Sequence, residues 1–135
     1  MKRVLVTGGS GKLGRECVRD LLEHGLEVFN ADAVPSKDNL CAFRQVDFED
    51  MAQTIQVISA MDFGHYRSVD AIVHLAAVPM PGLQPNETVV RINTMTTYNV
   101  FEAARRLGIQ NIVWASSETL LGLPFDQPPP IFSPR

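Results

Sequence analysis

The sequence has little of what marks secreted, metal-binding or membrane proteins. Its two cysteines, Cys17 and Cys41, are far apart, form no CxxC pair and have no His nearby that could complete a metal site, so we expect reduced thiols and no bound metal. No apolar run approaches the roughly 20 residues of a membrane-spanning helix, and the short hydrophobic stretch after Met1 does not resemble a signal peptide. We therefore expect a cytoplasmic protein with no membrane partner.

Positive charge is also scarce. The 135 residues carry 12 Lys and Arg against 15 Asp and Glu, a net charge of −3, and no basic cluster stands out beyond Arg105 and Arg106. A nucleic-acid-binding surface needs concentrated positive charge, so we expect no nucleic-acid partner. With 45% hydrophobic and 20% charged residues, the composition is that of one soluble globular domain.

Strand and helix patterns alternate along most of the chain. Short buried runs predict strands at 2–6, 27–32, 43–46, 71–76 and 112–115, and apolar residues at helical spacing predict helices at 12–24, 48–60 and 86–107. Gly25 and Gly108 are placed to end two of these helices. This alternation predicts an α/β fold, a doubly wound parallel sheet of about five strands covered by helices on both faces.

The last part of the chain differs in composition. Residues 123–135 include Pro124, Pro128, Pro129, Pro130 and Pro134, which exclude a helix and disfavour an interior strand. We therefore place one domain at residues 1–122 and a proline-rich loop or tail at 123–135.

The stretch VTGGSGKLGR, residues 6–15, places glycines at 8, 11 and 14 directly after a predicted strand. Glycine costs roughly 0.5–1 kcal/mol where helix or strand could form, so this density requires a compensating reason. Between a strand and a helix, such glycines allow a tight turn, backbone approach to a pyrophosphate and close helix packing, and the helix N-terminus attracts the anion. We infer a dinucleotide-binding turn; the alternative is a glycine-rich turn that binds nothing. The residues assigned to it are Gly8, Ser10, Gly11, Lys12, Leu13 and Gly14.

Asp32 stands at the end of the next predicted strand, where a carboxylate can accept both ribose hydroxyls of an adenosine. Its charge would repel a 2′-phosphate, so NAD is favoured as the cofactor over NADP. Lys12 and Lys37 are near enough in sequence to blur that preference, and a plain solvated turn residue is the alternative for Asp32.

These residues resemble the extended short-chain dehydrogenase/reductases, also called the NAD-dependent epimerase/dehydratase family, from Met1 to about Gly122. The family motif TGxxGxxG is matched by Thr7 and the three glycines, and the resemblance implies a Rossmann-type fold. It also implies further cofactor contacts: Asp32 at the adenosine ribose, Asp47 and Phe48 beside the adenine, Leu75, Ala76 and Ala77 along the ribose and pyrophosphate, Asn93 near the nicotinamide, and Ser116 after the fifth strand.

Each of these residues has a structural alternative. His74, in the same HLAA stretch, is assigned no proton chemistry and is interpreted as a satisfied strand-end histidine. Asp47 could instead cap the helix expected from Phe48. Asn93 on a buried helix face needs hydrogen-bond partners for any role, and the serine pair could be ordinary turn residues.

The resemblance implies hydride transfer between the nicotinamide and a substrate carbon. A tyrosine then transfers the proton of the substrate oxygen, a lysine four residues later lowers the pKa of that tyrosine, and a Ser or Thr, here Ser117, binds the substrate oxygen. Glu118 follows where dehydratase members carry an acid, and Leu121 replaces a usual aromatic. The residues four beyond Tyr66 and Tyr98 are acidic, and all lysines precede residue 38, so the sequence contains no YxxxK. We therefore expect the 135-residue chain to be the cofactor-binding part of the enzyme and inactive or nearly so by itself.

The resulting hypothesis is an NAD(P)-dependent oxidoreductase, epimerase or dehydratase acting on a sugar nucleotide or a small carbonyl or alcohol. The alternative is a non-catalytic NAD(P)-binding sensor or regulatory module, which the missing tyrosine and lysine favour. The resemblance also implies a homodimer formed through the helix at 86–107, with apolar surface exposed on the isolated chain.

Overall fold

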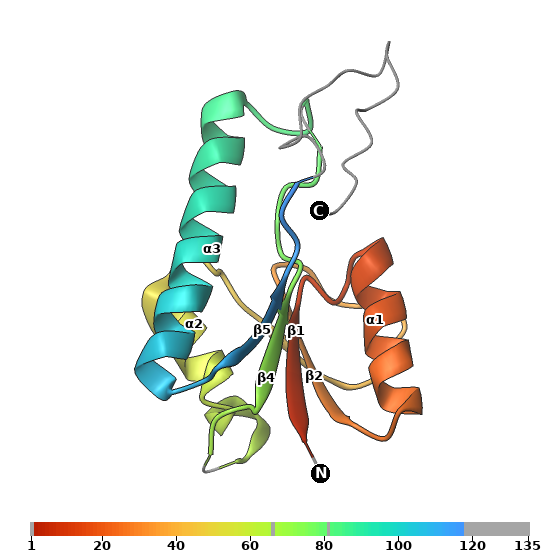
Figure 1. Cartoon of the computed structure of the whole chain (residues 1–135). Coiled ribbons are helices and arrows are strands. Elements are labelled where there is room, and N and C mark those ends of the chain that lie inside the picture. The colour runs from red at the N-terminus through yellow and green to blue at the C-terminus, as the bar shows by residue number, and fades with distance from the viewer. Residues whose placement is uncertain (1, 66, 81, 118–135) are drawn as a thin grey trace, which may run out of the picture.

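The computed structural model describes residues 2–65, 67–80 and 82–117, which form one parallel sheet with helices on both sides (Figure 1). The strands are β1 (Arg3–Thr7), β2 (Glu27–Asp32), β3 (Ala42–Gln45), β4 (Ala71–His74) and β5 (Asn111–Trp114), in the order β3-β2-β1-β4-β5. All four pairings are parallel, and the register places Thr7 beside Ala31 on one side and beside His74 on the other. The predicted doubly wound sheet is confirmed.

Three helices and one short 3-10 helix connect the strands. They are α1 (Lys12–Glu23), α2 (Met51–Ile58), η1 (Met61–Phe63) and α3 (Asn86–Leu107). The predicted bounds hold for α3 and β2, and α3 ends at Gly108 in the left-handed conformation, φ +72°. The prediction that α2 begins at Phe48 is wrong, because the carboxylate of Asp50 caps the helix by accepting the backbone N–H groups of Ala52 and Gln53.

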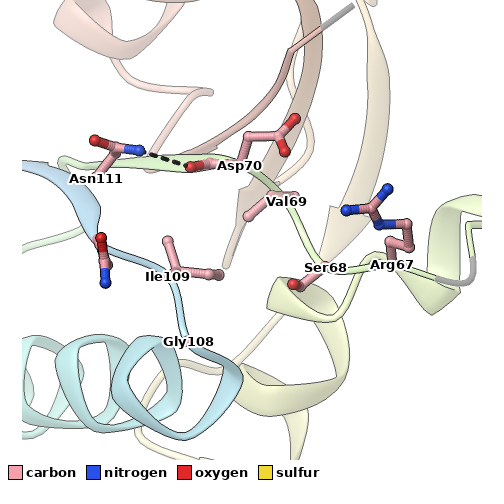
Figure 2. A pocket seen from close by; sticks show the side chains of 8 residues that line it. Arg67, Ser68, Val69, Asp70, Gly108, Ile109 and Asn111 are labelled. Carbon is pink, nitrogen blue, oxygen red and sulfur yellow. Dashed lines mark hydrogen bonds between the residues drawn. The ribbon is translucent and has the colours of Figure 1, made fainter.

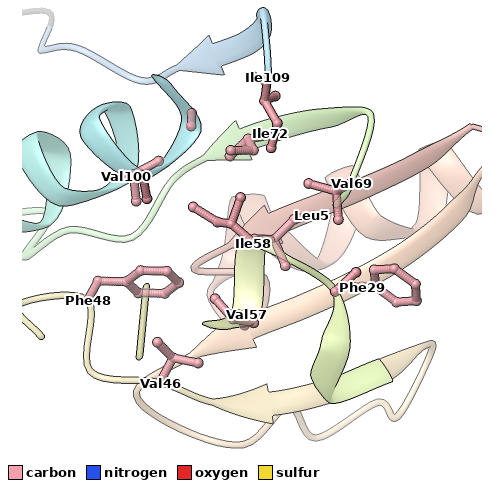
Figure 3. Close-up of a cluster of buried hydrophobic side chains, with 14 residues drawn as sticks. Leu5, Phe29, Val46, Phe48, Val57, Ile58, Val69, Ile72, Val100 and Ile109 are labelled. Atoms are coloured by element: carbon pink, nitrogen blue, oxygen red, sulfur yellow. The ribbon is translucent and has the colours of Figure 1, made fainter. Parts of the chain in front are cut away.

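Two hydrophobic clusters hold the layers together. Helices α2 and α3 pack on one face of the sheet and α1 on the other (Figure 1). The larger cluster joins the α2–α3 face of the sheet, through Leu5 and Ile72, to Val57, Ile58 and Val100 of the helices (Figure 3). The smaller one is formed by Val6 and Val28 of the sheet and Val18 of α1. Burial of these side chains is the main stabilising contribution to the fold.

Coverage of the sheet is less complete than predicted. In the described part of the chain, the β5 side chains Val113 and Trp114 are 65% and 46% exposed, so the expectation of helices over both faces holds for β1 and β2 but not for β5. β4 ends at His74 rather than at residue 76. The reason is local: the N–H of Leu75 is shared between the carbonyl and the hydroxyl of Thr7, and the N–H of Ala76 donates to the same hydroxyl instead of continuing the ladder.

Among the described residues, no helix has the length and apolar composition needed to cross a membrane. The same residues contain no group of three or more His, Cys, Asp or Glu side chains arranged to hold a metal ion. The proline-rich segment 123–135 and the predicted positions Glu118 and Leu121 lie outside the described residues.

Candidate functional site

The candidate site lies at the carboxyl ends of β1 and β4, the neighbouring strands at the centre of the sheet. From β1 the chain continues to β2 on one side, whereas β4 and β5 lie on the other. In open parallel sheets, ligands bind in the crevice outside the strand ends where the order reverses in this way. The glycine turn predicted to hold a diphosphate follows β1 directly, at this reversal.

Two of the predicted glycines are required by the fold itself. Gly8 has φ +71°, its N–H donates to the carbonyl of Ala31 at 2.9 Å, and a Cβ there would lie 2.7 Å from the backbone nitrogen of Ala76. A Cβ on Gly14 would lie 2.1 Å from the carbonyl oxygen of Gly8. The turn and α1 therefore approach each other more closely than any side chain allows.

Gly11 differs from both, because nothing within the protein requires a glycine there. Its φ of −73° suits any residue, and a Cβ would make only an ordinary 3.4 Å contact with the oxygen of Gly8. Gly11 is the N-cap of α1 and offers no side-chain cap, whereas α2 is capped by Asp50. The first-turn N–H groups, including those of Lys12 and Leu13, have no partner within the helix. The protein thus leaves space and hydrogen-bond donors at this point.

Asp32 is tied to the glycine turn by a small hydrogen-bond network. The N–H of Ser10 donates to Oδ2 of Asp32 at 3.0 Å, and the N–H of Val34 donates to Oδ1 at 3.3 Å. The hydroxyl of Ser10 donates to the carbonyl of Val34 at 2.8 Å. Because each carboxylate oxygen has two lone pairs, Asp32 retains acceptor capacity for further hydroxyl donors.

Sequence reasoning missed two residues beneath the turn, Gly9 and Asn30. Asn30 is 3% exposed on β2, and its Nδ2 donates to the hydroxyl of Ser10 at 3.2 Å. A Cβ on Gly9 would lie 2.3 Å from Oδ1 of Asn30, so the amide occupies the space that the glycine leaves. The available signal was a lone polar residue inside an otherwise apolar strand.

His74 is buried at the end of β4 and serves as a structural hydrogen-bonding residue. The hydroxyl of Thr7 accepts the N–H groups of Leu75 and Ala76, both at 3.2 Å, so its own hydrogen points to Nδ1 of His74 at 2.7 Å. The imidazole is therefore neutral and carries its proton on Nε2, which faces the hydroxyl of Thr97 at 3.4 Å. Burial lowers the pKa of His74 from 6.5 to about 4.

This lowered pKa predicts acid sensitivity of the fold. The unfolded chain protonates His74 below pH 6.5 and the folded chain only near pH 4, so its stabilising contribution is complete above pH 6.5 and declines toward pH 4. The expected loss is about 3 kcal/mol of unfolding free energy across that range. Urea unfolding at pH 7.5 and 4.5 measures it, with His74→Asn as the control because its amide oxygen keeps an acceptor near the position of Nδ1. Equal pH dependence in both proteins would contradict the assignment.

The predicted adenine-side pair, Asp47 and Phe48, separates in the structure. Asp47 is exposed, and its Oδ1 accepts the N–H of Glu49 at 2.9 Å; it does not cap α2, so that alternative is wrong. The ring of Phe48 lies in the larger hydrophobic cluster, so only the Phe48 backbone can take part in a surface site. The buried Asn99 of α3, which sequence reasoning did not select, donates from Nδ2 to the carbonyls of Phe48 and Glu49 at 2.8 and 2.9 Å.

Asn93 of α3 fixes the loop that follows β4. Its Oδ1 accepts the N–H of Val78 at 2.8 Å and its Nδ2 donates to the carbonyl of Val78 at 3.1 Å. Asn93 therefore has the structural role that the sequence offered as its alternative. The three residues that follow β4 differ in burial. Leu75 packs on the smaller hydrophobic cluster, Ala76 packs on the larger one, and Ala77 is exposed.

Ser116 and Ser117 follow β5 and are exposed. The N–H of Ala115 donates to the carbonyl of His74 at 3.1 Å, which attaches the serine segment to the end of β4. The structure thus brings the predicted turn, Asp32, the 75–77 segment and the serine pair to the same end of the sheet.

A separate hollow of about 230 Å³ lies at the opposite end of the sheet, around the amino ends of β4 and β5 (Figure 2). It is bordered by Asp70, whose carbonyl accepts the side-chain amide of Asn111 at 3.3 Å, and by Gly108 after α3. None of the predicted site residues lines it.

A sequence model of the NAD-dependent epimerase/dehydratase family matches residues 4–133. The chain belongs to this family. Members are NAD-dependent by the family's own description, which agrees with the glycine turn and carboxylate found at the strand ends.

Individual members of this epimerase/dehydratase family are similar to the chain over most of its length. It is 31% identical to the UDP-glucose 4-epimerase of Mus musculus, covering 96% of the chain and 43% of that protein, and 34% identical to the uronate dehydrogenase of Agrobacterium fabrum, covering 90% and 43%. The solved uronate dehydrogenase of Agrobacterium tumefaciens superposes with a TM-score of 0.70 at 33% identity, covering 87% of the chain and 41% of that structure. The Thermus thermophilus UDP-glucose 4-epimerase in complex with NAD gives 0.71 at 30% identity, covering 85% and 37%. The chain thus spans about two fifths of the length of these relatives.

Proposed function

We propose that this chain binds NAD across the carboxyl ends of β1, β2 and β4. The observation that carries the proposal is Gly11, where the backbone is open although the protein itself would accommodate a side chain. A diphosphate supplies the missing reason, because it must approach the backbone closely and is attracted by the unpaired N–H groups and dipole of the helix start. The unpaired donors would come from the first helical residues, Lys12 and Leu13, while Ser10 and Gly11, whose N–H groups are bonded to Asp32 and Gly8, would line the turn beside the diphosphate.

The remaining predicted contacts complete the proposed site. Asp32 would accept the adenosine ribose hydroxyls, and Asp47 with the backbone of Phe48 would border the adenine. The backbone of Leu75, Ala76 and Ala77 would run along the second ribose and diphosphate, with Asn93 and Ser116 toward the nicotinamide. In this arrangement Gly8 and Gly14 shape the turn without contacting the ligand through side chains. The carboxylate at Asp32 favours NAD over NADP by repelling a 2′-phosphate.

We further propose that the chain is the cofactor-binding part of an oxidoreductase, epimerase or dehydratase acting on a sugar nucleotide or a small carbonyl or alcohol. The names of its relatives, UDP-glucose 4-epimerase and uronate dehydrogenase, support this substrate class. NAD, when bound, supplies the hydride acceptor. Ser117 would donate a hydrogen bond to the substrate oxygen, and the 135 residues, which contain no YxxxK, would bind without turnover.

Calorimetric titration of the purified chain with NAD tests the proposal. We expect saturable binding, weakened about tenfold or more by Asp32→Asn because a hydroxyl loses its charged acceptor. Asp20→Asn, an exposed carboxylate near the end of α1, is the matched control and should leave NAD affinity unchanged. Absence of NAD binding by a folded wild-type chain would refute the proposal.

A non-catalytic NAD sensor is the second candidate, favoured by the absence of YxxxK from the sequence. The two hypotheses agree on binding and differ in chemistry. Hydride transfer from a sugar or sugar-nucleotide substrate to NAD, measured as NADH absorbance with the chain joined to a downstream segment carrying YxxxK, supports the enzyme. Binding without any such activity supports the sensor.

We also propose a homodimer formed through the outer face of α3. That face carries the exposed apolar side chains Val90, Tyr98 and Phe101, and the ring of Phe101 meets Trp114 of β5 edge-on at 5.9 Å. Large apolar side chains exposed on one helix face are typical of interaction surfaces. Light scattering of the purified chain decides between dimer and monomer.

A further inference from the structure

We propose that Asp38 is a second determinant of dinucleotide selectivity, withholding Arg15 and Arg19 from the 2′-phosphate of NADP. The inference rests on the proposed NAD site. Asp38 lies in the loop at 33–41 that joins β2 to β3 and begins directly after Asp32. This loop returns to α1, so the ribose carboxylate and the arginines of α1 border the same stretch of chain.

A single carboxylate oxygen of Asp38 faces both arginines. Its Oδ2 lies 3.5 Å from Nη1 of Arg15 and 3.7 Å from Nη2 of Arg19. Both distances exceed the 2.7–2.9 Å typical of a charge-assisted hydrogen bond, so Asp38 attracts the two guanidinium groups without hydrogen-bonding to them. Nη1 of Arg19 is already bonded to Glu16, which leaves Arg15 as the arginine whose donors Asp38 mainly controls. Among the described residues, the buried Nε of Arg15 has no hydrogen-bond partner. Because that nitrogen is buried, another anion would reach Arg15 through its Nη groups, of which Nη1 lies only 3.5 Å from Asp38.

The arginines are connected to the proposed ribose position through the loop at 33–41, which begins after Asp32 and reaches them at Asp38. The hydroxyl of Ser10 donates to the carbonyl of Val34, and the N–H of Ser10 donates to the carboxylate of Asp32. These bonds join the glycine turn to the beginning of the loop at 33–41. Arg15 emerges one turn into α1, where its N–H donates to the carbonyl of Gly11. A guanidinium there has the geometry and charge that recognise a phosphate on the ribose 2′ oxygen.

Asp38 opposes such recognition in two ways: it neutralises the arginines, and it would repel a 2′-phosphate. Around the site, the other charged groups are Asp32, Lys12 and Lys37 on the turn and loop, and Glu16, which pairs with Arg19 at 2.6 Å. Removing the Asp38 charge leaves Asp32 and Glu16 as the nearby counter-charges, with Glu23 of α1 also acting on Arg19. Selectivity for NAD then depends on Asp32 alone.

Calorimetric titrations of NAD and NADP against the chain test this inference, since the two ligands differ only in the 2′-phosphate. Asp38→Asn should tighten NADP binding about fivefold and change NAD binding less than about twofold, because a surface ion pair of about 1 kcal/mol is released toward the 2′-phosphate. Asp20→Asn removes the same charge from an exposed position on α1 and should change the affinity for neither ligand. Adding Arg15→Gln to Asp38→Asn should abolish the gain, and thermal melting checks that each variant is folded.

The outcomes separate the two proposals. If Asp38→Asn leaves the NADP affinity unchanged, tightens NAD equally, or keeps its gain when Arg15 is replaced, the selectivity role is overturned while NAD binding stands. A folded wild-type chain that binds neither nucleotide overturns the proposed function and this inference with it.

Discussion

Replacing Gly11 with valine is expected to abolish NAD binding while the protein stays folded. The valine side chain would occupy the open space beside the helix start, and the backbone at φ −73° accepts it without strain. Losing two charge-assisted hydrogen bonds to a diphosphate predicts at least about a hundredfold weaker binding. The cost to unfolding free energy should be about 1 kcal/mol, because valine is a poorer N-cap residue than glycine but no side-chain hydrogen bond is lost.

Gly11→Ala provides the graded control. Its single carbon makes an ordinary 3.4 Å contact within the protein, so we expect an intermediate loss of NAD affinity with only a small fall in melting temperature from the poorer N-cap. Binding is measured by calorimetry and folding by thermal melting on the same samples. A valine variant that binds NAD like the wild type would remove the main support for the proposed site.

Replacing Gly14 with alanine is expected to damage the fold itself. The added Cβ would lie 2.1 Å from the carbonyl oxygen of Gly8 and 2.6 Å from the Cα of Gly9, both backbone atoms that cannot rotate away. Separating α1 from the turn should reduce the unfolding free energy by about 3 kcal/mol or more. NAD binding would then be lost through unfolding rather than by blocking a site.

Gly25→Ala makes the same chemical change where nothing lies within 4 Å of the new carbon, at φ +75°. It should cost only about 1–2 kcal/mol for the left-handed conformation. Urea unfolding of the two variants gives the comparison. Equal losses in both would show that the contact between turn and helix is not tight in solution.

Much of the fold was predictable because local patterns agree with the tertiary arrangement. Helix α3 and strand β2 have the predicted bounds, since apolar periodicity and a terminal Gly108 act within a few residues of chain. The errors arose where distant contacts decide. Two candidate caps, Asp47 and Asp50, precede α2. Phe48 is buried in the core and lies with Glu49 in a turn closed by the bond from the Asp50 N–H to the Asp47 carbonyl, so the helix begins only after the second aspartate.

The candidate site divides in the same way. The spacing of the glycines and the position of Asp32 after the second strand are visible in the sequence, because strand, turn and helix follow one another directly. The placement of Asn30 under Gly9 and of Asn99 against the loop after β3 is not visible, because these partners are 21 and 51 residues apart along the chain. Sequence separation of this size carries no local signal.

The sequence by itself determined the alternation of strands and helices, the glycine turn and the carboxylate that follows β2. Only the tertiary structure distinguished the glycines that the fold requires, Gly8 and Gly14, from Gly11, which leaves space for a ligand. It also decided that Asp38 faces two arginines and that His74 is held neutral. The physical reason is that steric clearance, charge pairing and burial depend on which distant atoms come together, whereas backbone conformation is largely set by near neighbours.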